Sequence, residues 1–145
     1  MRLSMFAILI WAGVLPFFIG ALLLSFPGLT MAWSVSPALV QRLFSFYAMA
    51  IALFMAGTHW GAVLVGQPVP QSRGWLMLSN IQVLALWLVY ALCPLSVQLI
   101  TVIASLVISL LIDRQLGDLF AGQYFWHRTR VTICVICLLV WVLWQ

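Results

Sequence analysis

Residues 42–66 read RLFSFYAMAIALFMAGTHWGAVLVG, a mostly apolar run with one arginine at its start and one histidine inside it. A helix needs about 20 such residues to cross a hydrocarbon core of about 30 Å. Small residues and the histidine fall within an arc of about 80° when the run is drawn as a helix. These residues are Ser45, Ala48, Ala52, Ala56, His59 and Gly66. The run is therefore predicted to be a transmembrane helix near the centre of a bundle, with this face against its neighbours.

The roughly opposite face of the same helix carries Gly57 and Gly61, a Gly-x-x-x-Gly pair. Such a pair allows two helix backbones to approach closely in a membrane. We therefore expect a second neighbouring helix on that face.

Four more spans follow from the same length criterion, at residues 3–26, 75–92, 95–112 and 130–144. Gly13 and Pro16 predict a kink in the first of them, because proline breaks the helical hydrogen-bond ladder. Cys93-Pro94 alone separates the third and fourth predicted helices, which should form a tight hairpin. The predicted fold class is all-α, a five-helix transmembrane bundle that makes residues 1–145 one domain.

Composition supports a membrane protein. The 145 residues include six arginines and two aspartates as the only formally charged side chains, and 66% of residues are hydrophobic. Soluble domains usually have about a quarter charged residues. Six scattered arginines also cannot build a phosphate-binding face, so no nucleic-acid partner is expected, and membrane lipids are the expected counterpart of the net charge of +4.

The arginines predict an orientation. Five spans place all arginines except Arg42 on one side of the membrane, and the positive-inside rule makes that side the cytoplasm. The N-terminus is then cytoplasmic, the C-terminus lies outside, and a bacterial inner membrane is the expected location. Residues 113–129 become a cytoplasmic connection, predicted to lie as a short helix in the headgroup plane. The candidates for lipid headgroup binding are Arg73, Arg114, His127, Arg128 and Arg130.

The polar residues inside the predicted spans gather toward the cytoplasmic half. Gln98, Thr101, Ser105 and Ser109 form a seam along one face of the fourth span, and Asp113 follows close to that face. Counted by helical rise, one layer is expected to contain His59, Asn80, Ser109 and Cys134. The candidates for ligand binding or proton relay are His59, Trp60, Asn80, Ser109 and Asp113.

His59 is the only ionisable side chain well inside a predicted span, so it is a functional candidate. A proton-exchange role would suit imidazole, and the neutral ring would also suit a quinone carbonyl, a metal or a haem. A neutral histidine that only fixes helix register is the alternative. No catalytic residue and no metal site is predicted, since Cys134 and Cys137 lie within an apolar segment and no sequence feature brings them near His59.

Several segments together are typical of a known family. They are Gly13-Val14-Leu15-Pro16-Phe17, Tyr47 with Gly57-Thr58-His59-Trp60-Gly61, and Asp113 with Gly122, Trp126, Arg128 and Thr132. This pattern resembles the small bacterial membrane proteins grouped as domain of unknown function 3429, which include the eukaryotic transmembrane protein 69. The resemblance implies a helical membrane protein, and it carries no established activity.

The leading functional hypothesis is a non-enzymatic membrane protein. It would act as an accessory subunit of a larger complex, as a homo-oligomer, or as a holder of a lipid or quinone-like ligand. The alternative is a small proton-coupled transporter or permease, which His59, the polar seam and Asp113 favour. An enzyme acting on lipid headgroups, with His59 or His127 beside Asp113 or Asp118, is the third class.

Overall fold

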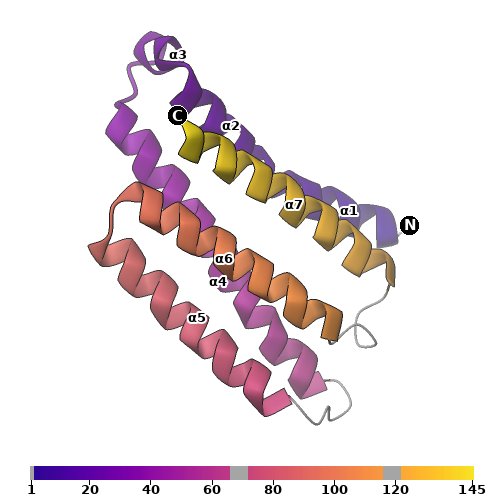
Figure 1. Cartoon of the computed structure of the whole chain (residues 1–145). Coiled ribbons are helices and arrows are strands. Elements are labelled where there is room, and N and C mark those ends of the chain that lie inside the picture. The colour runs from indigo at the N-terminus through magenta and orange to yellow at the C-terminus, as the bar shows by residue number, and fades with distance from the viewer. Residues whose placement is uncertain (1, 66–71, 116–121) are drawn as a thin grey trace.

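The structure is a computed structural model that describes residues 2–65, 72–115 and 122–145 (Figure 1). These residues form α1 (Arg2–Ala12), α2 (Leu15–Ser25), α3 (Pro27–Ala32), α4 (Pro37–Val65), α5 (Ser72–Leu92), α6 (Leu95–Gln115) and α7 (Gly122–Trp144). Five spans long and apolar enough to cross a membrane are found within the described ranges, the first of them running through α1 and α2. The prediction of an all-α bundle of five transmembrane helices is confirmed.

The first span is interrupted between α1 and α2, at the predicted position of the kink. Pro16 lies in the first turn of α2, where its missing N–H costs least. The hydroxyl of Tyr47 in α4 donates to the carbonyl of Gly13 at 3.0 Å, and the rings of Phe17 and Tyr47 pack with centroids 5.0 Å apart. The interruption is thus held against the centre of the bundle by one hydrogen bond and one aromatic contact.

The α4 helix is the centre of the bundle, packed against α2, α5 and α6. Its small-residue face is buried as predicted over all the members that the structure describes, Ser45, Ala48, Ala52, Ala56 and His59. Gly66 lies outside the described residues. Side chains of this size let α5 and α6 approach α4 closely, which brings polar groups on three helices within reach of one another.

The expected close neighbour at Gly57 and Gly61 is not found. Both glycines are exposed, and a Cβ built on either one meets nothing within 4 Å among the described residues. Their face of α4 belongs to the outer surface of the chain, alongside Phe54 and Leu64.

The tight hairpin between α5 and α6 is present. Gln98 in the first turn of α6 donates to the carbonyl of Cys93 at 2.8 Å and to that of Tyr90 at 3.2 Å. These carbonyls end α5 and have no partner further along their own helix. One glutamine therefore caps α5 and fixes its angle to α6.

The predicted connection at residues 113–129 is wrong at both ends, and the correction changes the position of residues that form the site. Residues 113–115 belong to α6 and residues 122–129 to α7, so the predicted in-plane segment at 113–129 is not a separate element. Its middle, residues 116–121, lies outside the described residues. The apolar content of Phe125 and Trp126 extends the last span instead of lying flat in the headgroups.

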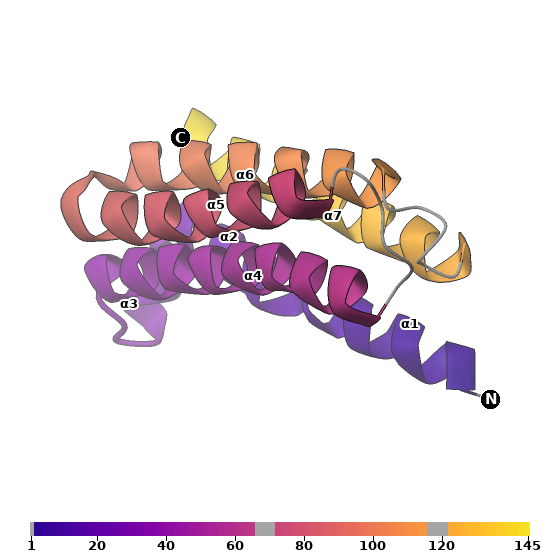
Figure 2. The same ribbon diagram turned by 90° about the horizontal axis from the view of Figure 1, so that it is seen from below.

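Helix ends gather at two poles of the bundle. Figures 1 and 2 agree that the start of α1, the end of α4, the start of α5, the end of α6 and the start of α7 lie at one pole. The α3 helix, the α5–α6 hairpin and the C-terminus lie at the other, where Trp141 of α7 donates to Ser25 of α2 at 2.8 Å. Arg42 is near this second pole, in the second turn of α4.

The packing of α2 on α4 can be tested at Gly20. A Cβ at this position would lie 2.5 Å from the Phe44 ring, which is only 4% exposed and has little room to move. We expect Gly20→Ala to lower the free energy of unfolding in mixed detergent micelles by about 1–3 kcal/mol, the usual cost of overpacking. Gly57→Ala, which meets no neighbouring atom, is the matched control; equal effects of the two substitutions would contradict this packing.

Candidate functional site

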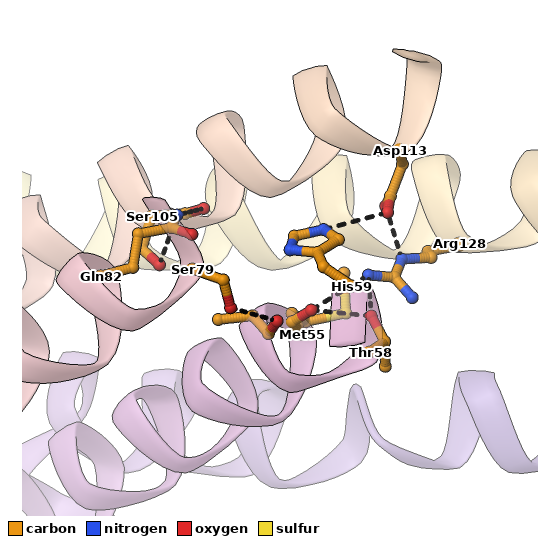
Figure 3. A network of polar contacts seen from close by, with 9 residues as sticks. Met55, Thr58, His59, Ser79, Gln82, Ser105, Asp113 and Arg128 are labelled. Carbon is orange, nitrogen blue, oxygen red and sulfur yellow. Dashed lines mark hydrogen bonds and ion pairs between the residues drawn. The ribbon is translucent and has the colours of Figure 1, made fainter. Parts of the chain in front are cut away.

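Three ionisable side chains from three helices meet inside the bundle near the first pole. His59 of α4 and Asp113 of α6 are fully buried, and Arg128 of α7 is 4% exposed. His59 Nε2 lies 3.2 Å from Asp113 Oδ1, and Arg128 Nε lies 2.7 Å from Asp113 Oδ2 (Figure 3). We call these three residues the charge cluster.

Asp113 is the middle member of the charge cluster and uses one oxygen for each partner. It occupies the same face of α6 as Ser105 and Ser109, at successive helical turns. The extension of α6 beyond the predicted end at residue 112 is what carries Asp113 inside. Its carboxylate therefore approaches His59 from within the bundle instead of from its rim.

Arg128 is held by α4 as well as by Asp113. Its Nη2 donates to Thr58 Oγ1 at 2.8 Å and lies 3.5 Å from the carbonyl oxygen of Met55. Thr58 in turn donates to that same carbonyl at 2.7 Å. The guanidinium thus fastens α7 to α4 and α6 at one point.

The charges of the cluster balance. Arg128 and Asp113 contribute one positive and one negative charge, so a neutral His59 leaves the buried group with no net charge. An isolated charge is costly in a membrane interior, and removing one member of a buried pair leaves the other uncompensated. Arg128 and Asp113 are therefore necessary to each other in this position.

A second set of polar contacts continues from the cluster into the bundle. Ser79 of α5 donates to the carbonyl of Ala56 at 2.7 Å, and Gln82 Nε2 donates to the carbonyl of Ser105 at 3.1 Å. Figure 3 shows these residues beside His59 on the side away from Asp113. Polar groups from α4, α5 and α6 thus extend along the interior from the charge cluster.

The predicted ligand or relay residues divide into two groups. His59, Ser109 and Asp113 are buried together on adjoining faces of α4 and α6. Trp60 is 39% exposed and Asn80 is exposed, so neither faces the cluster. On α5 the inward positions are Ser79 and Gln82, which lie one turn apart on the face that also carries Leu86.

The predicted headgroup residues also divide. Arg73, Arg114 and Arg130 are exposed, and His127 is half-buried. Arg130 stacks over the Trp126 ring with its guanidinium carbon 2.9 Å from the centroid. For Arg128 the headgroup prediction is wrong, because its side chain turns inward and pairs with Asp113.

Arg128 could have been found from the sequence by applying the length criterion more strictly. The predicted last span of 130–144 has only 15 residues, too few to cross a core that needs about 20. Extending it backward by the missing turn places Arg128 inside the membrane, where a charge needs a partner. Asp113 and Asp118 were the only carboxylates available.

An apolar cavity of about 350 Å³ adjoins the charge cluster. Its lining comes from α1, the α1–α2 interruption, α2, α4, α6 and α7, and Arg128 and Thr132 are its polar side chains. Ligand cavities in proteins typically measure about 300–1,000 Å³ and are mostly apolar with a few polar groups. This cavity has that character. By contrast, no group of three His, Cys, Asp or Glu side chains suited to a metal ion occurs in the described part of the chain.

The strength of the charge cluster can be measured by a double-mutant cycle. We expect Asp113→Asn or Arg128→Gln alone to lower the free energy of unfolding by about 3–5 kcal/mol, because each removes one member of a buried ion pair. The double variant should lose less than the sum of the two, as monitored by unfolding in mixed detergent micelles. Arg130→Gln is the control, because Arg130 is an exposed arginine two residues further along α7. Additive losses in the double variant would show that Asp113 and Arg128 do not interact.

Comparison with known proteins places the chain by family alone. No curated protein and no solved structure is significantly similar to it. A family model described as protein of unknown function (DUF3429) matches residues 4–144, which include every member of the charge cluster. The chain belongs to this family.

Proposed function

We propose that this protein is a non-enzymatic membrane protein that binds one lipophilic molecule with a polar end group, such as an isoprenoid quinone or an acyl lipid. The observation that carries the proposal is the cavity of about 350 Å³, which is apolar except where Arg128 and Thr132 reach it. An apolar chain is solvated about equally well by lipid and by an apolar cavity. Binding of such a ligand is therefore favoured only if the site also forms hydrogen bonds to its polar end. Arg128 and Thr132 together offer hydrogen bonds to such a group at one position in the cavity lining.

The rim of the cavity supports entry from the membrane. Leu9 of α1 is 63% exposed and Phe54 of α4 is 67% exposed, and both contribute to the lining. Their outer surfaces face the hydrocarbon that surrounds a transmembrane bundle. A lipid-like molecule therefore reaches the cavity sideways without crossing water.

The chemistry of the polar residues favours an acceptor group on the ligand. Arg128 carries five N–H donors and no acceptor, and a threonine hydroxyl can donate as well. Because Asp113 already balances the Arg128 charge, the ligand need not be an anion. A carbonyl oxygen of a quinone or an ester meets this requirement.

The proposal is tested by filling the cavity. Val131 and Ile133 lie two residues apart on α7, but Val131 lines the cavity whereas Ile133 is 52% exposed on the outer surface. We expect protein purified from native membranes in mild detergent to carry a lipophilic molecule detectable by native mass spectrometry. Val131→Trp should reduce its occupancy at least fivefold, and Ile133→Trp should leave occupancy unchanged.

Absence of any co-purified lipophilic molecule, both from native membranes and after incubation with a bacterial lipid and quinone extract, would refute the proposal. Equal loss in the two tryptophan variants would show that the molecule binds elsewhere. The unfolding midpoint of each variant in mixed micelles provides the check that both proteins fold.

Proton-coupled transport is the second candidate, and the charge cluster is the specific observation that favours it. Ionisable side chains within membrane spans commonly belong to ion or proton pathways. Here a histidine that can exchange protons touches a carboxylate, and polar groups on α5 and α6 continue from it. A chain of this size would have to oligomerise or undergo a large rearrangement to form a complete pathway.

Transport is tested in proteoliposomes that contain a pH-sensitive dye. If the protein carries protons, an imposed pH gradient should collapse several times faster than in protein-free vesicles, and His59→Gln should remove the difference. Arg130→Gln serves as the control, since its side chain is outside the cluster. Identical rates for the native protein, His59→Gln and empty vesicles would eliminate this candidate.

For its setting we propose a bacterial inner membrane with the first pole of the bundle in the cytoplasm. The support is charge: Arg2 begins α1, Arg73 is in the first turn of α5 and Arg114 is in the last turn of α6, and these helix ends lie at that pole. Arg130 is in the half of α7 nearer to that pole, whereas Arg42 is near the opposite end of α4. Positive charge collects on the cytoplasmic side of membrane proteins. Membrane lipids are the proposed partners of the exposed arginines, and assembly with a larger complex or a second copy would use the uncovered outer faces.

A further inference from the structure

Apart from the ion-paired atoms of the charge cluster and one atom each of the half-buried Trp75 and His127, three buried polar atoms have no hydrogen-bond partner among the described residues. They are His59 Nδ1 on α4, Gln82 Oε1 on α5 and Ser109 Oγ on α6. The three residues are 0%, 5% and 0% exposed. A buried polar atom without a partner costs about 1–3 kcal/mol, so three of them on adjoining helices require an explanation.

The Ser109 hydroxyl does not make the hydrogen bond that is usual for a serine within a membrane helix. Serine and threonine hydroxyls in membrane helices usually donate to a carbonyl one turn earlier. In this chain Ser25, Thr101 and Thr129 do so, at 2.7, 2.8 and 2.9 Å. Ser109 does not, although it lies in the middle of a regular helix, so its hydroxyl is available to another group in the interior.

The His59 ring directs its unpartnered nitrogen toward the polar groups of α5 and α6. Nε2 faces Asp113, and Figure 3 shows the other ring nitrogen on the opposite side, toward Ser79 and the Gln82–Ser105 contact. Ser109 lies between Ser105 and Asp113 on the same face of α6. It is thus at the same level of the bundle as the ring.

Gln82 completes the set. Its amide nitrogen is used twice, by the carbonyl and by the hydroxyl of Ser105 at 3.1 and 3.3 Å. The contact with the carbonyl of Ser105 fixes which end of the amide is the nitrogen, because a carbonyl oxygen can only accept a hydrogen bond. The carbonyl oxygen of Gln82 is left as an acceptor.

We propose that His59, Gln82 and Ser109 bind buried water, and that this water makes His59 a proton relay between the bundle interior and Asp113. Buried waters typically make about three hydrogen bonds to otherwise unsatisfied groups. Here a water molecule donates to His59 Nδ1 and to Gln82 Oε1 and exchanges a hydrogen bond with the Ser109 hydroxyl.

The relay step conserves protons. A hydrated proton at the water gives its proton to Nδ1 and leaves water; the proton on Nε2 passes to Oδ1 of Asp113. The products are a neutral imidazole in its other tautomer and a neutral carboxylic acid. The groups that face His59 are Asp113 from α6 and Arg128 near it from α7, while Ser79 and Gln82 of α5 are uncharged.

The test uses the full chain in lipid bilayers, labelled with ¹⁵N in histidine. The sequence has two histidines, so His127→Asn assigns the ring signals of His59. Solid-state NMR should detect magnetisation transfer from water to the His59 Nδ1 site. Ser109→Ala and Gln82→Leu should each reduce this transfer at least threefold, with the tautomer ratio of the ring changed.

Ser45→Ala is the matched control, because Ser45 is also a buried serine but lies on α4 near the opposite pole, where it donates to the carbonyl of Arg42. It should leave the transfer unchanged. A His59 ring that receives no magnetisation from water, or a transfer unaffected by both substitutions, would overturn the water site. If Gln82→Leu fails to fold, Ser109→Ala decides alone. The lining of the apolar cavity does not include His59, Gln82 or Ser109, so different substitutions test the water site and the ligand site.

Discussion

The pairing of Arg128 with Asp113 is the interaction on which the interior of this bundle depends. Each charge alone would be costly in a medium that cannot solvate it, and each is accommodated because the other is 2.7 Å away. The pair joins α6 and α7, and Thr58 extends the junction to α4. Three helices are thereby fixed in register at one depth, and His59 acquires a defined ring orientation.

The pair also explains why two kinds of environment lie side by side. On one side of Arg128 is the apolar cavity, and on the side of His59 away from Asp113 are the polar groups of Ser79 and Gln82. Ser109 lies one turn before Asp113 on α6. The charge cluster forms the boundary between them. A change in ligand occupancy and a change in protonation would both act on the same three side chains, which gives the two proposals a common physical basis.

Hydropathy and helical phase predicted most of this architecture, for identifiable reasons. Length and charge defined five spans, and the repeat of Ser45, Ala48, Ala52 and Ala56 correctly identified the buried face of α4. The polar candidates His59, Ser109 and Asp113 followed from the same phase.

The inward position of Arg128 did not follow from the sequence, because arginine near a span end is ordinarily a headgroup anchor, and only its partner shows that it turns inward. Asn80 was predicted from its depth alone, and helical phase cannot tell which of the opposed polar residues Asn80 and Gln82 faces a neighbour. The Gly57–Gly61 pair satisfied a packing pattern that any membrane helix can contain without a neighbour in the same chain.

The length of α4 has a consequence for the surrounding bilayer. Its 29 residues extend about 44 Å, whereas the 21 residues of α5 and of α6 extend about 32 Å, close to the thickness of a hydrocarbon core. A straight helix of the greater length fits only by tilting, by projecting into the headgroups, or by thickening the bilayer around it. Since α4 carries His59 and Thr58, a change in bilayer thickness that altered its tilt would displace these residues relative to Asp113 and Arg128. Bilayer thickness would thus act on the geometry of the buried charges through the tilt of α4 relative to α6 and α7.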